Sequence, residues 1–278
     1  MKLRWAACRP PAGQRAPAAR TPPGTVVYAI GDIHGRLDLL DALLQGIALD
    51  AGLRQAERRV LVYLGDYVSR GAHSRGVVDR VIGWRPAGFE VVALKGNHEE
   101  AMLRFLDGEL FVGGHWMGHG GVDTLAQYGV VPEDPARRDT DTLEHLRTRL
   151  REAVPPTHLA LLRSLAASHR EGDYLFVHAG VQPGVPLDEQ SERDFVWIRN
   201  RFLVSDRDHG AVVVHGHCIS EQPEVRHNRI GIDTGAYRSG VLTCLVLDGV
   251  ERSFLQTATN TRNGPAEARG EVRPDSCQ

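Results

Sequence analysis

Short apolar runs alternate with segments of helical periodicity over the first hundred residues. The runs TVVYAI, VLVYL and FEVVAL predict strands over residues 25–30, 60–64 and 89–94. Leucine and isoleucine at helical spacing predict a helix over 37–49, and shorter helices are expected around 77–84 and 99–106. A strand that is apolar on both faces must be covered on both. The alternation therefore predicts an α/β fold with a parallel sheet between helices.

The pattern changes after residue 107. Residues 107–157 are glycine-rich and then charged, which predicts a cap insertion with a helix near 141–153. A helix over 158–167 and strands over 174–177, 211–214, 229–232 and 241–247 follow, with turn residues and no long helix between the strands. This half is expected to be more antiparallel. We expect a disordered leader (1–24), a catalytic domain (25–258) and a loose tail (259–278).

Composition excludes several classes of protein. The chain has 278 residues, of which 42% are hydrophobic and 24% charged, and its net charge is −2. This charge argues against nucleic acid as the main partner. No apolar stretch approaches the roughly 18 residues of a membrane span. The four cysteines form no CxxC pair, which predicts a reducing, cytoplasmic location without structural disulfides.

Side chains that can bind metal follow five successive predicted strands, mostly beside glycines. They are Asp32, His34, Asp66, Asn97, His98, His178, His215 and His217. Oxygen and imidazole donors without thiolate favour Mn²⁺, Fe or Zn²⁺ over Ca²⁺. The set exceeds what one tetrahedral ion needs, so it predicts a two-metal site with a bridging carboxylate. Arg70, four residues after Asp66, has the planar fork that suits phosphate.

Each of these signals has an ordinary explanation when taken alone. Glycine and aspartate after a strand usually form a turn. A single histidine at a strand end is more often a hydrogen-bonded structural residue than a ligand, and Asn97 could cap the helix that follows it. Five such coincidences at successive strand ends favour a functional site. His115 and His119 are expected in a cap loop, because the glycines between them are poor helix formers.

The segments GDIHG, GDYVSRG and GNHE, in this order and spacing, resemble the calcineurin-like metallophosphoesterases. Within that superfamily they are most similar to the bacterial and phage members of the phosphoprotein phosphatase branch. The resemblance runs from about residue 26 to 247. It implies an αββα sandwich of two mixed β-sheets flanked by helices, and two divalent metal ions. Mn²⁺ is the leading candidate, with Fe or Zn²⁺ as alternatives.

The resemblance also implies roles for individual residues. Asp32 and His34 would hold the first metal, Asp66 would bridge, and Asn97, His178 and His217 would hold the second. His98 would be the general acid, and Arg70 and Arg199 would bind phosphate. Glu99 and Asp233 would support these residues without binding metal. In the cap segment WMGHGGVDTLAQYG, which resembles bacterial phosphatases, glycine and threonine would shape a loop.

The chain departs from the family pattern at Ser69, where most relatives have an aspartate that orients the general-acid histidine. Serine can hydrogen-bond His98 but cannot stabilise its imidazolium by charge. The family's RGP continuation is also replaced, by Gly71, Ala72 and His73.

Three functions remain open from the sequence. The leading hypothesis is a phosphomonoesterase that acts on phosphoserine or phosphothreonine in proteins, with small phosphoesters as other substrates. The alternative is a symmetrical diadenosine tetraphosphate hydrolase, whose relatives carry GNHD and an alanine at the position of Ser69. The second alternative is a non-catalytic phosphopeptide-binding module. GNHE favours the protein phosphatase, and the missing aspartate favours the diadenosine tetraphosphate hydrolase.

Overall fold

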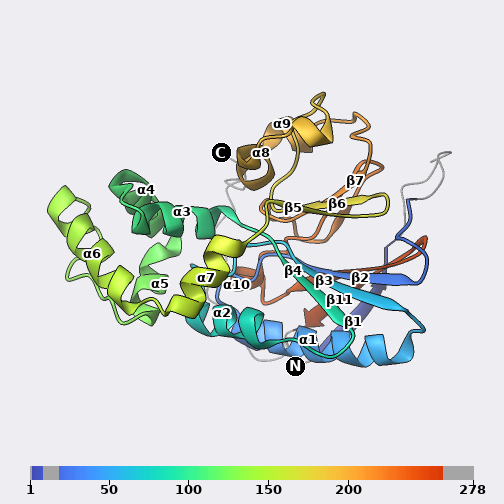
Figure 1. Cartoon of the computed structure of the whole chain (residues 1–278), viewed down its shortest axis with the longest axis horizontal. Helices are drawn as coiled ribbons and strands as arrows, with labels where there is room; N and C mark the ends of the chain where they lie inside the picture. The colour runs from blue at the N-terminus through green and yellow to red at the C-terminus, as the bar shows by residue number, and fades with distance from the viewer. Residues whose placement is uncertain (1, 9–18, 259–278) are drawn as a thin grey trace.

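Two β-sheets pack face to face in the computed structural model, with helices on both outer faces (Figure 1). The structure describes residues 2–8 and 19–258. The first sheet has the strand order β1-β11-β10-β2-β3-β4. Its strands are β1 (Lys2–Ala7), β2 (Thr25–Ile30), β3 (Arg58–Tyr63), β4 (Phe89–Ala93), β10 (Thr243–Asp248) and β11 (Glu251–Ala258). The strands β2, β3 and β4 are parallel, as predicted, and β10 joins β2 in antiparallel.

The second sheet has the order β5-β6-β7-β9-β8. Its strands are β5 (Ser168–Glu171), β6 (Tyr174–Val177), β7 (Val212–His215), β8 (Glu224–Val225) and β9 (Arg229–Gly231). The second half of the chain is more antiparallel than the first, as predicted, since β5 pairs with β6, β8 with β9, and β10 with β2 and β11 in antiparallel. At the centre of this sheet, however, β6, β7 and β9 are parallel. The crossover between β6 and β7 contains only short helices, α8 (Glu192–Trp197) and α9 (Asn200–Leu203), which are too short to give a clear periodicity.

The period of two along each strand divides its side chains between two cores. In β2, Val27 and Ala29 face the second sheet, whereas Tyr28 and Ile30 face the helices. The core between the sheets also takes Phe176 and other residues of the second sheet. Because both faces are buried, these strands have continuous apolar runs in the sequence. This burial explains why the runs predicted a sheet that is covered on both faces.

Helices cover the outer faces of the two sheets. On the side of the first sheet lie α1 (Leu37–Leu53), α2 (Ser74–Gly83), α3 (Asn97–Leu106) and α7 (Pro156–Ser164), and their apolar faces share one hydrophobic core. The helices α8 and α9 cover the second sheet, with a 3₁₀ turn at Leu187–Glu189 before them. A short helix α10 (Ala236–Ser239) follows β9.

The cap is helical and lies beside the sheets, at the left in Figure 1. It comprises α4 (Leu110–Trp116), a π-helical turn (Met117–Gly121), α5 (Val122–Gln127) and α6 (Thr140–Ala153). Buried side chains of the cap, among them Leu125 and Leu146, belong to the same core as Phe105 of α3. The expected cap loop is wrong at His115, which lies in α4, where tertiary packing overrides the weak helix propensity of the glycines. At His119 and Gly120 the backbone is non-helical, with φ of −109° and 95°, so the chain kinks there as glycine permits.

The expected disordered leader is corrected at residues 2–7, which form the edge strand β1. It pairs in antiparallel with β11, and Trp5 lies opposite Leu255. A strand whose partner is about 250 residues away gives no local signal in the sequence. Residues 9–18 and the tail 259–278 lie outside the described residues. Among the described residues no helix has the length and apolar character needed to cross a membrane.

Candidate active site

The carboxyl ends of five parallel strands bring the predicted ligands together. Asp32 follows β2, Asp66 follows β3, Asn97 follows β4, His178 follows β6 and His217 follows β7. Two groups of buried or nearly buried side chains have all their donor atoms within 4.8 Å of one another. One group is His34, Asp66 and His98, and the other is Asp66, His178 and His217. Asp66 belongs to both, which is the placement expected of a bridging ligand.

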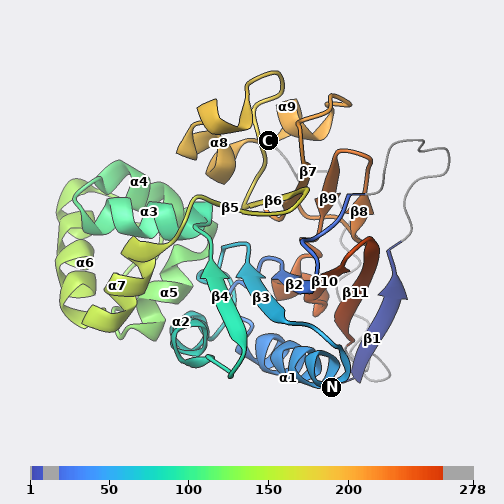
Figure 2. The same cartoon turned by 45° about the vertical axis from the view of Figure 1, so that its right-hand side comes forward.

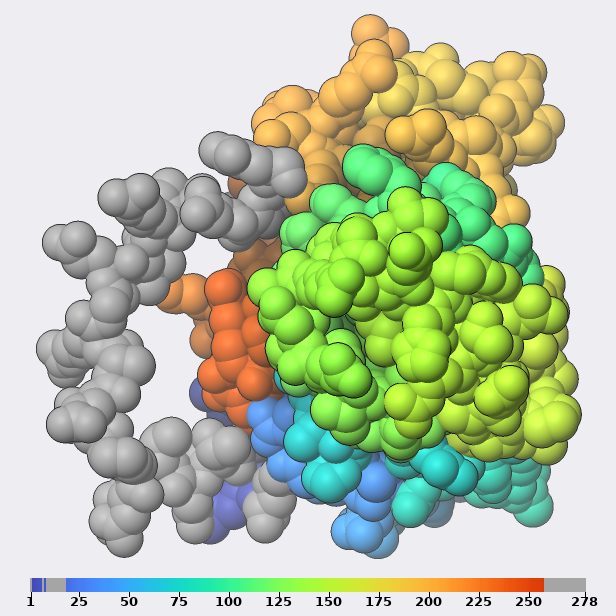
Figure 3. Space-filling view, turned by 90° about the vertical axis from the view of Figure 1, so that its left-hand side faces the viewer, coloured from blue at the N-terminus to red at the C-terminus, as the bar shows by residue number. Residues whose placement is uncertain are grey.

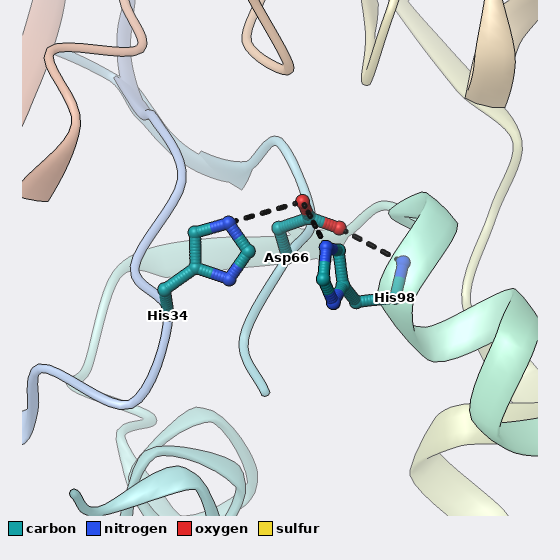
Figure 4. A group of neighbouring side chains, drawn as sticks. All are labelled: His34, Asp66 and His98. Carbon is teal, nitrogen blue, oxygen red and sulfur yellow. Dashed lines mark hydrogen bonds and ion pairs between the residues drawn. The ribbon is translucent and has the colours of Figure 1, made fainter. Parts of the chain in front are cut away.

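The two carboxylate oxygens of Asp66 face different neighbours (Figure 4). Oδ2 lies 3.3 Å from His34 Nε2, and Oδ1 lies 3.6 Å from His178 Nε2. Oδ1 also accepts a hydrogen bond of 3.1 Å from the backbone amide of His98. Burial opposes ionisation of Asp66, but His178, His98 and Arg70 together lower its pKa below the usual value. The side chain is therefore ready to bind cations as a carboxylate.

Backbone carbonyls orient two of the histidines. His34 Nδ1 lies 2.9 Å from the carbonyl of Val68, and His178 Nδ1 lies 2.9 Å from that of Leu64. With Nδ1 donating, each Nε2 keeps its lone pair directed toward Asp66. Burial lowers the pKa of both histidines. They are therefore neutral imidazoles, the form that binds metal.

Asn97 completes the second half of the centre. Its Oδ1 lies 3.0 Å from His178 Nε2 and 2.9 Å from His217 Nδ1. The backbone amide of His217 donates to the carboxylate of Asp32 at 3.1–3.2 Å, which connects the two halves. Burial, followed by the neighbouring carboxylates of Asp233 and Asp66, raises the pKa of Asp32 well above its usual value. A carboxylate whose pKa is raised by neighbouring carboxylates, as that of Asp32 is by Asp233 and Asp66, is stabilised in the ionised form when a cation binds.

The donor chemistry of this centre fits two divalent cations. By the roles that the family resemblance implies, Asp32, His34 and Asp66 would hold one, and Asp66, Asn97, His178 and His217 would hold the other, with nitrogen and oxygen donors and no thiolate. Asp32 lies in neither of the two donor groups, and His98 stands beside His34 and Asp66 in its place. His215, which the sequence left open, belongs to neither group. Its Nδ1 lies 3.1 Å from the carbonyl of Gly216, and its ring stacks edge-on against Phe202.

Two predicted phosphate-binding arginines reach the centre. Arg70 Nη1 lies 3.1 Å from His34 Nε2, and its guanidinium lies 4.8 Å from the ring of Tyr237. Arg199 Nε donates to His217 Nε2 at 3.0 Å. A cation bound by His34 Nε2 requires Arg70 to leave that nitrogen, and the guanidinium is then available to oxygen atoms above the centre. Both arginines line a cavity of about 450 Å³ beside His98.

Glu99 binds the loop that carries Asp66. Its carboxylate accepts hydrogen bonds from the backbone amides of Asp66, Tyr67 and Val68 at 2.8–3.1 Å, and from Gly96 at 3.1 Å. Burial raises the pKa of Glu99 to about 8, while these amide hydrogen bonds oppose the shift. The contacts agree with the prediction that Glu99 supports the site without binding metal.

The backbone of the site is strained. Within the described residues, all non-glycine residues with a positive φ lie here: His34, Asp66, Ser69, Arg70 and His217, with φ between 45° and 75°. Such conformations persist only where the surrounding structure enforces them, and they cluster at functional sites.

The cap supplies part of that enforcement. Arg70 N donates to the carbonyl of Gly120 at 3.2 Å, and Ser69 N donates to Thr124 Oγ1 at 2.9 Å. Glycine and threonine of the cap segment therefore shape the neighbouring loop, as the sequence interpretation held.

Two glycines allow the backbone to pass close to the predicted ligand carboxylates. A Cβ at Gly96 would lie 2.2 Å from Asp66 Oδ1, and one at Gly216 would lie 2.0 Å from Asp32 Oδ1. Neither distance is compatible with a side chain, so glycine is required at both positions by proximity.

The side chain of Ser69 makes no hydrogen bond with His98 among the described residues. Its Oγ accepts a hydrogen bond of 3.0 Å from Trp116 Nε1 of the cap. The buried Nδ1 of His98 has no hydrogen-bond partner among the described residues. The side chain of Ser69 is therefore engaged with the cap, and the hydrogen bond to His98 that serine could offer is not formed among the described residues.

Sequence reasoning missed several residues that line the cavity. Tyr237 and Arg238 come from α10, Trp197 from α8, and His115 and His119 from the cap. The two histidine rings stack with centroids 4.3 Å apart. Tyr237 and Arg238 directly follow the segment of Asp233, and Trp197 stands two residues before Arg199. Proximity in sequence to predicted site residues was the available signal.

Comparisons with known proteins agree with this geometry. The family model described as calcineurin-like phosphoesterase matches residues 25–227. The asymmetrical bis(5'-nucleosyl)-tetraphosphatase PrpE of Bacillus anthracis is 26% identical over 235 residues, covering 78% of this chain and 88% of that protein. A symmetrical bis(5'-nucleosyl)-tetraphosphatase of Acidovorax ebreus is 32% identical over 174 residues, covering 59% of this chain and 47% of that protein.

A crystal structure titled as that of a candidate diadenosine tetraphosphatase shares the fold. Its TM-score is 0.55 at 20% sequence identity, and the alignment covers 84% of this chain and 98% of that one. The family uses a dinuclear centre of divalent metal ions, which the donor groups around Asp66 can hold. The matched span contains the sites of Asp32, Asp66, Asn97, His178 and His217. The chain belongs to the calcineurin-like phosphoesterase family.

Proposed function

We propose that this protein is a metal-dependent hydrolase of dinucleoside tetraphosphates, which cleaves one phosphoanhydride bond with water. The observation that carries the proposal is the cavity of about 450 Å³ in which Arg70, Arg199 and Arg238 stand beside the metal-competent centre. Three guanidinium groups suit a chain of several phosphates better than a single phosphoryl group. The similarity to two bis(5'-nucleosyl)-tetraphosphatases supports the same substrate class.

The residues of the centre divide the chemical work. The two ions, when bound, supply an activated water and neutralise charge on the phosphate that it attacks. Arg70 and Arg199 bind non-bridging phosphoryl oxygens, where charge accumulates in the transition state. His98 Nε2 lies 3.4 Å from Arg70 Nη2, within the same cavity. From there His98 can deliver a proton to the leaving oxygen.

The surroundings of His98 favour a phosphoanhydride over a phosphoserine. Its Nδ1 has no hydrogen-bond partner among the described residues, and the side chain of Ser69 bonds to Trp116. A histidine without a carboxylate at this nitrogen has a lower pKa, so a smaller fraction of it is protonated and able to donate at neutral pH. A departing nucleoside phosphate is a weak base that needs little protonation, whereas a serine alkoxide needs a proton.

The second candidate is the protein phosphatase that the sequence favoured through Glu99 in GNHE. Glu99 is fully buried and bonds to backbone amides, and it is not among the residues that line the cavity. The signal that favoured a phosphatase therefore comes from the scaffold of the loop and does not contact substrate. For a non-catalytic phosphopeptide-binding module, the complete set of metal donors would have no purpose.

A turnover comparison tests the proposal. The Mn²⁺-loaded protein is given diadenosine tetraphosphate or a panel of phosphoserine and phosphothreonine peptides, and kcat/KM is measured with and without EDTA. We expect the dinucleotide to be the better substrate and EDTA to stop its turnover. Anion-exchange chromatography then assigns the cleaved bond, because symmetrical cleavage yields ADP alone and asymmetrical cleavage yields ATP and AMP.

Other results would overturn the proposal. A kcat/KM tenfold higher for a phosphopeptide would establish the phosphatase. Binding of phosphopeptides without turnover of any substrate would establish the binding module.

A further inference from the structure

A second hollow adjoins the catalytic cavity between α3, α4 and α8. Its volume is about 410 Å³, and it shares Ala101, His115 and Trp197 with the cavity of about 450 Å³. The cap helices, green in Figure 3, lie directly below the gold α8 segment, and the same neighbours appear together in Figure 2. The two hollows are therefore adjacent, and residues of the metal-competent centre line the first of them.

Aromatic and apolar side chains line this hollow. Trp197 donates its Nε1 hydrogen to the carboxylate of Glu100, which fixes the indole ring between α8 and α3. Phe111 is 87% exposed on α4, and Val112 lies beside it. The exposed phenyl ring of Phe111 and the held indole of Trp197 both line the hollow, and each offers flat apolar surface to a ligand. Purine and pyrimidine bases bind to such surfaces by stacking.

Two guanidinium groups stand at the rim. Arg104 pairs with Glu109 and lies near Glu100. These two carboxylates hold the guanidinium plane of Arg104 in place. Arg193 is exposed and enters no ion pair among the described residues. Arginine planes stack on nucleobases and attract phosphate. The rim therefore adds donors and positive charge to the aromatic surface.

We infer that this hollow is a subsite for one nucleoside of the substrate, so that the phosphate chain lies along Arg70 and Arg199 while the base stacks between Trp197 and Phe111. This inference rests on the proposed function, because it names where that substrate's nucleoside binds. A volume of about 410 Å³ is within the range of small-ligand sites, roughly 300–1,000 Å³.

The walls argue against a peptide as the occupant. Extended peptides are commonly bound through backbone hydrogen bonds to a free sheet edge. The walls of this hollow are three helices, whose backbone groups bond within each helix. A compact, flat ligand that binds through its faces therefore fits this space better than an extended chain.

The test compares two diphosphates of similar charge. The dissociation constants of ADP and methyl diphosphate are measured by calorimetry on the Mn²⁺-loaded protein. We expect ADP to bind more tightly than methyl diphosphate, and Phe111→Ala and Trp197→Ala each to weaken ADP about fivefold or more, the lower range of one base–aromatic stack. Methyl diphosphate should keep its affinity in Phe111→Ala. Leu53→Ala removes a similarly exposed apolar side chain (86%) from α1 and should change neither value.

Two results would overturn the subsite. One is equal affinity for ADP and methyl diphosphate in the wild-type protein. The other is an unchanged ADP affinity in Phe111→Ala, a variant at an exposed position that should fold normally.

The outcome is separable from that of the proposed function. Turnover of diadenosine tetraphosphate without any ADP preference would reject the subsite alone. An ADP preference lost in Phe111→Ala, in a protein that hydrolyses only phosphopeptides, would reject the proposed substrate and keep the subsite.

Discussion

Ser69 Oγ accepts a hydrogen bond of 3.0 Å from Trp116 Nε1, although the two residues are 47 positions apart in the chain. The contact joins the loop of the metal-competent centre to the cap. His98 Nδ1 has no hydrogen-bond partner among the described residues. The serine in GDYVSRG thus contacts the cap.

The first prediction tests this relationship. Burial lowers the pKa of His98 well below its usual value. Ser69→Asp would place a carboxylate near His98, stabilise the imidazolium and raise that pKa. Because a general acid must be protonated, the alkaline limb of the kcat/KM profile should move to higher pH. The shift should be larger for phosphoserine peptides than for p-nitrophenyl phosphate, whose leaving group needs little protonation.

Ser69→Asn is the matched control. Asparagine and aspartate both tolerate the left-handed backbone at this position, where φ is 75°, and they have nearly the same size. We expect no alkaline shift with the uncharged amide. An equal shift in both variants would mean that shape, and not charge, changed the profile.

The second prediction concerns the shared ligand. Asp66→Asn should lose metal and lower kcat/KM by more than the roughly 10–100-fold that follows loss of an outer hydrogen-bond partner, because one carboxylate serves both halves of the centre. Elemental analysis and initial rates measure the two effects. Asp38→Asn is the control, because the side chain of Asp38 is exposed on α1, and it should retain both metal and rate. Full metal content in Asp66→Asn would show that the bridge lies elsewhere.

The third prediction concerns the arginines that face the centre. Arg199→Ala should lower kcat/KM by about 100-fold or more, the usual cost of losing one preorganised donor to a developing oxyanion. Metal content should not change, since Arg199 is not itself a donor to the ions and contacts Nε2 of His217, whereas Nδ1 faces Asn97 and the centre. Arg201→Ala, an exposed neighbour on α9, should be kinetically silent. A silent Arg199→Ala would exclude this residue as a phosphate clamp.

The fourth prediction concerns the close approach at Gly216. In Gly216→Ala the new methyl group would lie 2.0 Å from Asp32 Oδ1, so the carboxylate must move and its contact with the amide of His217 must change. We expect weaker metal binding, measured by titration with Mn²⁺, and a lower melting temperature. Gly52→Ala adds the same methyl group in open space on α1 and should be neutral or slightly stabilising. Wild-type Mn²⁺ affinity in Gly216→Ala would contradict the assignment of Asp32 as a ligand.

The sequence by itself determined the first sheet's parallel core, and it predicted metal ligands of which His34, Asp66, His178 and His217 lie together in the structure. The strands around Ile30 and Tyr63 are buried on both faces, so their apolar runs are local and readable. The donors Asp32, Asp66 and Asn97 stand directly after such strands, and parallel strands end at one edge. Local pattern and a simple rule of topology were therefore enough to bring these residues to one place.

Only the tertiary structure decided how the rest of the chain completes the site. The pairing of β1 with β11, the helical cap around His115, and the partner of Ser69 all depend on contacts between segments far apart in sequence. The parallel arrangement of β6, β7 and β9 likewise became visible only in the fold. Local sequence carries propensity and period, but it does not record which distant side chain takes a given hydrogen bond. That choice is made by packing, because a buried polar group must find a partner among the groups that the fold places beside it.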